Sequence, residues 1–137
     1  MRMFEYELTV TRKSIDENQH ANNVRFVQWM QDAAVAHSNA LGWTLSEYEK
    51  INAAWIVRRH EIDYFNPAFL GDIVIVRTWV KNFRRIRCAR CYEIVEKREE
   101  KCLAQASTVW VFWDTAANRP KVIPEAMKLG FKPDSDL

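Results

Sequence analysis

Alternation of apolar and polar side chains is the clearest pattern in this chain. Near the N-terminus, Phe4, Tyr6, Leu8 and Val10 alternate with glutamates and threonines. This two-residue period is typical of a strand with one buried face. Four later segments show the same alternation and are rich in β-branched and aromatic residues. The predicted strands are residues 3–12, 53–65, 72–83, 86–97 and 101–114.

One long segment, residues 24–41, has helical spacing instead. Its apolar residues occupy most of the helix circumference, so we expect other elements to wrap around it. A second, short helix is predicted at residues 44–51, because Thr44 and Glu47 form a capping box. The remaining C-terminal predictions are a loop at 115–120, a weak helix at 124–130 and a frayed tail at 130–137.

The order of these elements predicts one α+β domain over residues 1–137. An antiparallel sheet has a hydrophobic face to cover, and only the long helix is apolar enough to cover it. We therefore expect a sheet of five or more strands wrapped around one long central helix. Long strands leave edges that a second copy can pair with, so the chain is expected to form a homodimer, possibly extended to a homotetramer.

Composition narrows the function classes. The net charge of +2 is too small to indicate nucleic-acid binding. No apolar run approaches the roughly 18 residues of a membrane span. The N-terminal segment lacks the pattern of a signal peptide, so a cytoplasmic location is expected.

Cysteine and histidine positions give no sign of a cofactor. Cys88, Cys91 and Cys102 are odd in number, which argues against a disulfide framework. The first two have C-x-x-C spacing inside a predicted strand, where ordinary strand cysteines are favoured over redox or metal chemistry. The three histidines lack metal-ligand spacing, and mid-helix His37 is favoured as a packing or interface residue. No metal or organic cofactor is expected.

A polar cluster, residues 14–23, stands directly before the long helix. It combines the Asp16 carboxylate, the His20 imidazole and several amides. A helix N-terminus offers free backbone N–H groups and favours negative charge. The cluster therefore suits an active site, although Asp16 in a turn and the asparagines as N-caps are structural alternatives.

The cluster carries a family resemblance. The pattern D-x-x-x-H-x-N-N-x-x-[FY], formed by Asp16, His20, Asn22, Asn23 and Phe26, resembles that of hot-dog fold thioesterases, in particular the 4-hydroxybenzoyl-CoA thioesterase group. A turn ending in Gly71-Asp72, before a Val/Ile-rich strand, supports the same resemblance. The loop is also similar to a motif of plant-type acyl-acyl carrier protein (ACP) thioesterases, which contain two hot-dog repeats.

The resemblance implies roles for individual residues. Asp16 stands at the position of the family's catalytic acid, which acts as nucleophile or as base toward water. The Asn23 backbone N–H stands at the position of the group that polarises the thioester carbonyl. In the plant-type group, residues matching Asn18 and His20 share in catalysis. The plant-type group uses a further acidic residue, and its position falls near Pro67 in this chain. Many relatives have a glycine directly before the histidine, where this chain has Gln19.

Candidate substrate-binding residues lie elsewhere. Arg84, Arg85 and Arg87 belong to a basic run, residues 81–90, at a predicted turn between strands. They either contact CoA phosphates or form a solvated strand face balanced by nearby glutamates. Trp29 and Phe65 either line an acyl pocket or pack in the core.

The leading function is hydrolysis of acyl-CoA or acyl-ACP thioesters. The first alternative is a hot-dog hydratase or dehydratase acting on enoyl thioesters, although one hydratase group spaces its Asp and His five residues apart and these are four apart. The second alternative is a non-catalytic acyl-thioester binding domain, because fold does not determine function.

Overall fold

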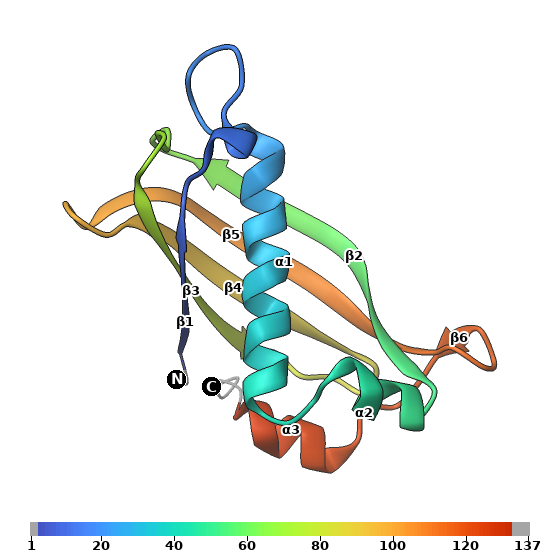
Figure 1. Ribbon diagram of the computed structural model, residues 1–137. Coiled ribbons are helices and arrows are strands. Elements are labelled where there is room, and N and C mark those ends of the chain that lie inside the picture. Colours follow the sequence, from blue (N-terminus) through green and yellow to red (C-terminus); the bar gives the residue numbers. More distant parts are fainter. Residues whose placement is uncertain (1–2, 133–137) are drawn as a thin grey trace.

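The computed structural model describes residues 3–132 and shows an antiparallel sheet with one long helix across its concave face (Figure 1). The predicted architecture, a curled antiparallel sheet with one long central helix, is thus confirmed. The elements are β1 (Phe4–Thr9), a 3-10 turn (Arg12–Ser14), α1 (Asn23–Ala40), α2 (Leu45–Lys50), β2 (Ala53–Tyr64), β3 (Ile73–Lys81), β4 (Arg87–Glu96), β5 (Lys101–Asp114), β6 (Arg119–Pro120) and α3 (Glu125–Phe131).

The strand order is β1-β3-β4-β5-β2, with the short β6 paired to the end of β5. Every pairing is antiparallel. A register shift between Val57 and Arg59 bends β2 where it lies against β5. At 12 residues, β2 is the longer of the two strands at the ends of this order, since β1 has six.

The sheet covers one side of α1. The side chains of Phe26, Trp29 and Met30 are buried there. On the other side, Val24 is 71% exposed and Val35 is 59% exposed. The prediction of a helix enclosed over most of its circumference is therefore wrong for this face, because one curved sheet reaches only the side that it faces.

Two hydrophobic clusters lie along the helix. The first contains Phe26, Met30 and Val76 and lies under the N-terminal half of α1. The second contains Phe112 and Met127 and joins α2 and α3 to the other end of the sheet. The second cluster meets the C-terminal half of α1 at His37, whose ring packs edge-on against that of Phe131.

Several element ends differ from the predictions. β1 ends at Thr9, before a 3-10 turn, and the predicted loop at 115–120 contains the two-residue β6. The expected tail at 130–137 is wrong at its start, because α3 continues to Phe131, which is 3% exposed in the second cluster. Residues 133–137 lie outside the described part. Within residues 3–132, no helix is long and apolar enough to cross a membrane.

Candidate active site

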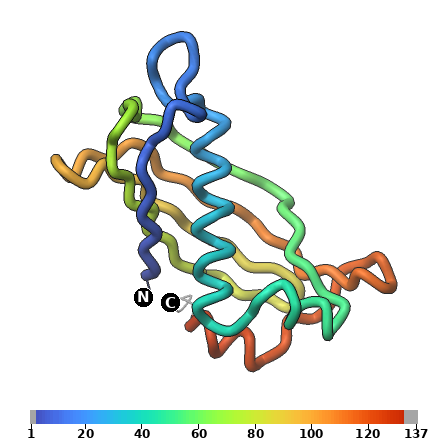
Figure 2. The backbone as a smooth tube through the Cα atoms, viewed as in Figure 1, coloured from blue at the N-terminus to red at the C-terminus, as the bar shows by residue number. Residues whose placement is uncertain are grey.

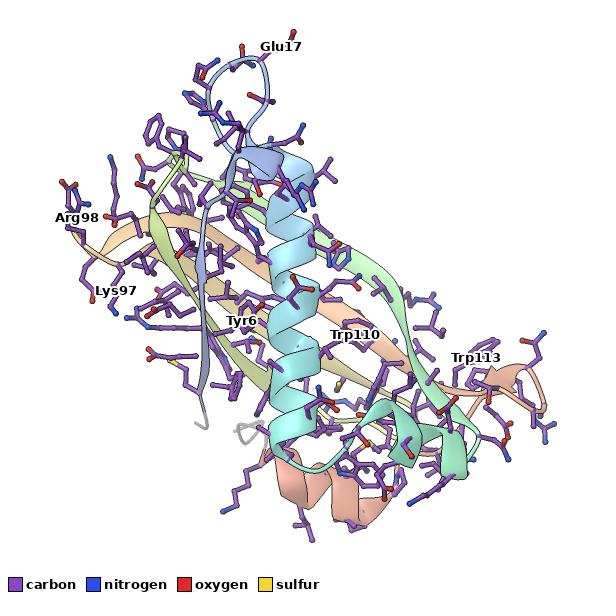
Figure 3. All side chains as sticks on the ribbon, viewed as in Figure 1. Tyr6, Glu17, Lys97, Arg98, Trp110 and Trp113 are labelled. Atoms are coloured by element: carbon purple, nitrogen blue, oxygen red, sulfur yellow. The ribbon has the colours of Figure 1, made fainter. Side chains whose placement is uncertain are left out.

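The loop between β1 and α1 projects beyond the sheet, and Glu17 lies at its tip (Figures 2 and 3). An isolated bridge between Ile15 and Ala21 closes the base of the loop. Inside it, the Asp16 N–H donates to the His20 carbonyl at 2.9 Å. Gln19, at the position where many relatives have glycine, has a φ of 63°. The loop thus places a non-glycine residue in the left-handed region, a conformation that non-glycine residues adopt uncommonly.

Further contacts attach the loop to the body of the protein. The Ala21 N–H donates to the Ala68 carbonyl at 2.8 Å, and the Asn22 N–H donates to the Ser14 carbonyl at 2.8 Å. The His20 ring packs edge-on against Phe69, with 5.3 Å between ring centroids. The segment between β2 and β3 therefore holds both the backbone and the imidazole of the loop.

Asn22 caps α1, as its sequence position allowed. Its Oδ1 accepts the Val24 N–H at 2.9 Å, and its carbonyl accepts the Arg25 N–H at 2.8 Å. The Asn23 N–H lies in the same first turn but makes no hydrogen bond within residues 3–132. It is one of the donors that a helix N-terminus leaves open to water or a ligand.

A hollow of about 400 Å³ lies where the loop, the start of α1 and the end of β2 meet. Asp16 is the one carboxylate in its wall. Its Oδ1 accepts the Asn18 N–H at 2.9 Å, and its other oxygen makes no hydrogen bond within residues 3–132. The carboxylate is thus held by one oxygen and open at the other. The wall is formed by Asp16, Asn18, His20, Ala21, Asn22, Asn23, Phe26, Tyr64, Phe65, Asn66 and Pro67.

Two polar wall residues, Tyr64 and Asn66, were not named in the sequence analysis. The Tyr64 hydroxyl donates to the Asn23 carbonyl at 3.3 Å, and burial raises the pKa of Tyr64, so the hydroxyl keeps its proton. The Asn66 Nδ2 donates to the Cys102 carbonyl at 2.8 Å and ties the turn after β2 to β5. In the sequence, Asn66-Pro67 marks only a turn, and nothing local relates Tyr64 to the helix start 41 positions earlier.

The hollow brings together all four predicted catalytic residues, Asp16, Asn18, His20 and Asn23, as well as Phe65. Trp29 is not in its wall. It is 5% exposed in the first cluster, with its ring centroid 4.8 Å from that of Phe26. Core packing is therefore the alternative that holds for Trp29.

The three predicted CoA-contacting arginines lie apart from the hollow in this chain. Arg84 and Arg85 are in the turn after β3, and Arg87 begins β4. The hollow lies near the other end of β3, and its nine residues span about 30 Å at the usual rise. Contact of these arginines with a phosphate of the substrate stays a prediction.

Pro67, near which the further plant-type acid was expected to fall, lies in the wall and cannot ionise. Residues 3–132 contain no group of three or more His, Cys, Asp or Glu side chains arranged to hold a metal ion. The wall of the hollow itself offers one carboxylate, one imidazole, several amides and backbone N–H groups.

Comparison with known proteins identifies the family of this chain. Residues 2–129 match the acyl-ACP thioesterase N-terminal domain family. The chain belongs to this family. A palmitoyl-acyl carrier protein thioesterase of Gossypium hirsutum chloroplasts is 23% identical over 137 residues, which cover 96% of this chain and 33% of the cotton protein. The chain thus spans about a third of the length of that relative.

Solved structures share the hot-dog fold. The 1,4-dihydroxy-2-naphthoyl-CoA thioesterase Slr0204 from Synechocystis superposes with a TM-score of 0.88 at 21% identity, covering 96% of both chains. A Staphylococcus aureus protein solved in complex with CoA superposes with a TM-score of 0.89 at 16% identity, covering 99% of this chain and 88% of the other. The predicted α+β hot-dog architecture of this thioesterase family member is confirmed.

Proposed function

We propose that this protein hydrolyses acyl thioesters of CoA or ACP to a free acid and a thiol. One observation carries the proposal: the open oxygen of Asp16 and the open N–H of Asn23 belong to residues in the wall of the same hollow. Membership of a thioesterase family supports the same reaction.

The two groups suit the two demands of thioester cleavage. A helix N-terminal N–H stabilises the negative charge that develops on the carbonyl oxygen. The Asp16 carboxylate either removes a proton from an attacking water or attacks the carbonyl carbon itself. In both routes the C–S bond breaks and the sulfur leaves as a thiolate that is then protonated. Water adds to the acyl carbon directly when Asp16 acts as base; when Asp16 attacks, water instead hydrolyses the acyl–Asp16 anhydride and so releases the acid and restores the carboxylate.

His20 and Asn18 have supporting roles in this proposal. The His20 imidazole relays the proton that reaches the leaving thiolate, and the Asn18 side chain orients the attacking water. Both residues belong to the wall of the hollow, while the Asn18 backbone N–H already holds Asp16. Phe65, at 55% exposure, offers apolar surface for the acyl group.

We also propose that two copies pair along β2, which lies at an end of the strand order. Antiparallel pairing of two β2 strands brings the hollow of one copy near the start of β2 in the other. Size-exclusion chromatography with light scattering is expected to give the mass of a homodimer or, if dimers associate further, of a homotetramer. A monomer at assay concentration contradicts this part of the proposal.

The decisive test measures thiol release from acyl-CoA and acyl-ACP thioesters with a thiol-trapping dye. Asp16→Asn removes the charge but keeps an Oδ1 acceptor for the Asn18 N–H, so the loop is expected to hold. Loss of general-base catalysis lowers the rate by about 10²–10⁴-fold. Glu17→Gln, a charge change at the loop tip, is the matched control and is expected to leave the rate within about twofold, since it lies outside the hollow.

Full activity in Asp16→Asn contradicts the assigned chemistry. Saturable binding of acyl-CoA without turnover by the native chain supports a binding domain instead. Hydration of an enoyl-CoA, seen as loss of its ultraviolet absorbance, supports the hydratase alternative.

A further inference from the structure

The imidazole of His20 belongs to the wall of the hollow, but no hydrogen bond orients it there. Within residues 3–132, neither of its nitrogens has a hydrogen-bond partner. In many active sites a carboxylate or carbonyl oxygen accepts a bond from one imidazole nitrogen and so fixes the ring. The His20 ring is also only partly buried, so its orientation requires another contact.

One ring contact can supply this orientation. The Phe69 ring lies at 87° to the His20 ring, with 5.3 Å between the two centroids. This is the edge-to-face arrangement that aromatic pairs prefer, and its energy favours one ring orientation by about 2–10-fold. The contact orients the imidazole without occupying a nitrogen in a conventional hydrogen bond.

The position of Phe69 is fixed by the turn that carries it, residues 66–72. The Phe69 N–H donates to the Asp72 Oδ2 at 2.9 Å, and the Asp72 N–H donates to the Phe69 carbonyl at 3.0 Å. Gly71 has a φ of 87°, which suits glycine, and its N–H donates to the Val10 carbonyl at 2.9 Å. The Gly-Asp sequence therefore forms a rigid support for the Phe69 ring.

The same turn is bound directly to the loop that carries His20. The carbonyl of the fully buried Ala68 accepts the Ala21 N–H at 2.8 Å. Two consecutive residues of the turn thus contact two consecutive residues of the loop, and Figure 2 shows turn and loop at the same end of the sheet. Phe69 is outside the wall of the hollow, so it can influence the site only through His20.

We propose that Phe69 is a positioning residue for the His20 imidazole and thereby speeds departure of the thiolate. The inference rests on the proposed thioesterase function, in which a proton of the consumed water reaches the sulfur through His20 as the C–S bond breaks. Phe69 takes no part in the proton transfer and only holds the ring that does. Its effect is therefore on kcat, and it depends on how much the leaving thiolate needs a proton.

Phe69→Leu tests this role with two thioesters of the same acid. With the acyl-CoA that the native chain hydrolyses fastest, kcat is expected to fall by about 3–10-fold and KM to change by less than about twofold. With the S-phenyl thioester, kcat is expected to stay within about twofold, because thiophenolate is a weak base that leaves readily without a proton. Phe69→Tyr keeps the ring and is expected to restore the native kcat.

A double-mutant cycle separates positioning of His20 from a general effect on the loop. In His20→Gln the imidazole is absent, so adding Phe69→Leu is expected to cause no further loss of kcat. Leu70→Ala is the matched control, since Leu70 lies in the same turn, is 50% exposed and is outside the wall of the hollow. A loss that persists in His20→Gln, equal losses with both thioesters, or a similar loss in Leu70→Ala each overturns the inference.

NMR of the histidine rings distinguishes failure of this inference from failure of the proposed function. The ring protons of His20, assigned by comparison with His20→Gln, are expected to be shifted by the nearby Phe69 ring, and Phe69→Leu is expected to remove that shift. If the native chain hydrolyses thioesters but the His20 signals are unchanged in Phe69→Leu, only this inference fails. If the native chain hydrolyses no acyl thioester, both fail.

Discussion

The two ends of α1 differ in how far the charged side chains beside them are exposed to water. At the N-terminal end, Asp16 and its neighbours line an open hollow, and loop hydrogen bonds hold the carboxylate by one oxygen. At the C-terminal end, Arg90 is 5% exposed and its hydrogen-bond partners are neutral. One end keeps its charge hydrated and accessible, and the other withdraws its charge from water.

This difference predicts which property each end controls. Surface polar groups contribute little to stability, so substitutions in the hollow should change the reaction and leave folding almost unchanged. Buried polar groups are costly to leave without partners, so substitutions around Arg90 should change the free energy of unfolding. The predictions that follow test this contrast, from the largest expected effect to the smallest.

After Asp16→Asn, the largest effect is expected from Asn23→Pro, and only on the rate. Proline removes the backbone N–H that we assign to the oxyanion, and it is well tolerated at the first position of a helix. Asn22, with φ −63° and ψ 139°, already has the extended conformation required before proline. Loss of one oxyanion donor lowers kcat by about 10²–10³-fold.

Asn23→Ala is the matched control, since it removes the side chain and keeps the N–H. We expect its rate to stay within about threefold of that of the native chain and the unfolding free energy of both variants to change by about 0.5 kcal/mol or less. Equal rates in the proline and alanine variants contradict the oxyanion role of this N–H.

Thr78→Val should lower stability at the other end. The fully buried Thr78 hydroxyl donates to the Cys91 carbonyl at 2.9 Å and accepts an Arg90 N–H at 3.1 Å. Valine has nearly the same shape and satisfies neither, so denaturant unfolding should show a loss of about 1–3 kcal/mol. Thr9→Val, at an exposed position of β1, serves as control, with an expected change of about 0.5 kcal/mol or less. Equal effects in the two variants remove the contrast between buried and exposed positions.

Cys88 should make the free energy of unfolding fall as pH rises in the alkaline range. Burial raises the pKa of its thiol to about 12, whereas the thiol of the unfolded chain ionises near 9. Between these values the folded state binds more protons, so stability falls as pH rises, with a slope of about 1.4 kcal/mol per pH unit from this group. Unfolding measured from pH 8 upward should show a shallower decline in Cys88→Ala. Identical declines in both proteins show that the thiol does not contribute.

Tyr64→Phe should have the smallest effect, again on the rate. It removes the hydroxyl that donates to the Asn23 carbonyl at 3.3 Å, a long and partly exposed bond. Looser positioning of the helix start is expected to lower kcat by about two- to fivefold. Tyr6→Phe removes a hydroxyl that has no partner within residues 3–132 and should not change kcat. A larger loss than in Asn23→Pro means that Tyr64 has a more direct role than positioning.

The sequence predicted the elements and the polar loop well, because the signals involved are local. Two-residue alternation marks every long strand, and Asn22 caps α1 at the position that its residue type favours. The loop that carries Asp16, His20 and Asn23 before the apolar helix also lines the hollow. Each of these features depends on residues within one or two turns of the chain.

Arg90 shows what the sequence analysis missed. It was grouped with Arg84, Arg85 and Arg87 as part of one basic run, yet it is buried while those three are exposed. The period of β4 held the signal, because Arg90 shares its face with the buried residues Cys88 and Tyr92. The run of charges masked that alternation.

By itself, the sequence determined the strands, the long helix and the chemical groups that stand before it, since these follow from hydrophobic periodicity and capping. Only the tertiary structure decided which groups meet. Strand register and the curl of the sheet bring Tyr64 to the start of α1 and Arg90 to its end, next to His37. Contacts between positions 41 and 53 residues apart arise from packing of the whole domain, which no local pattern specifies.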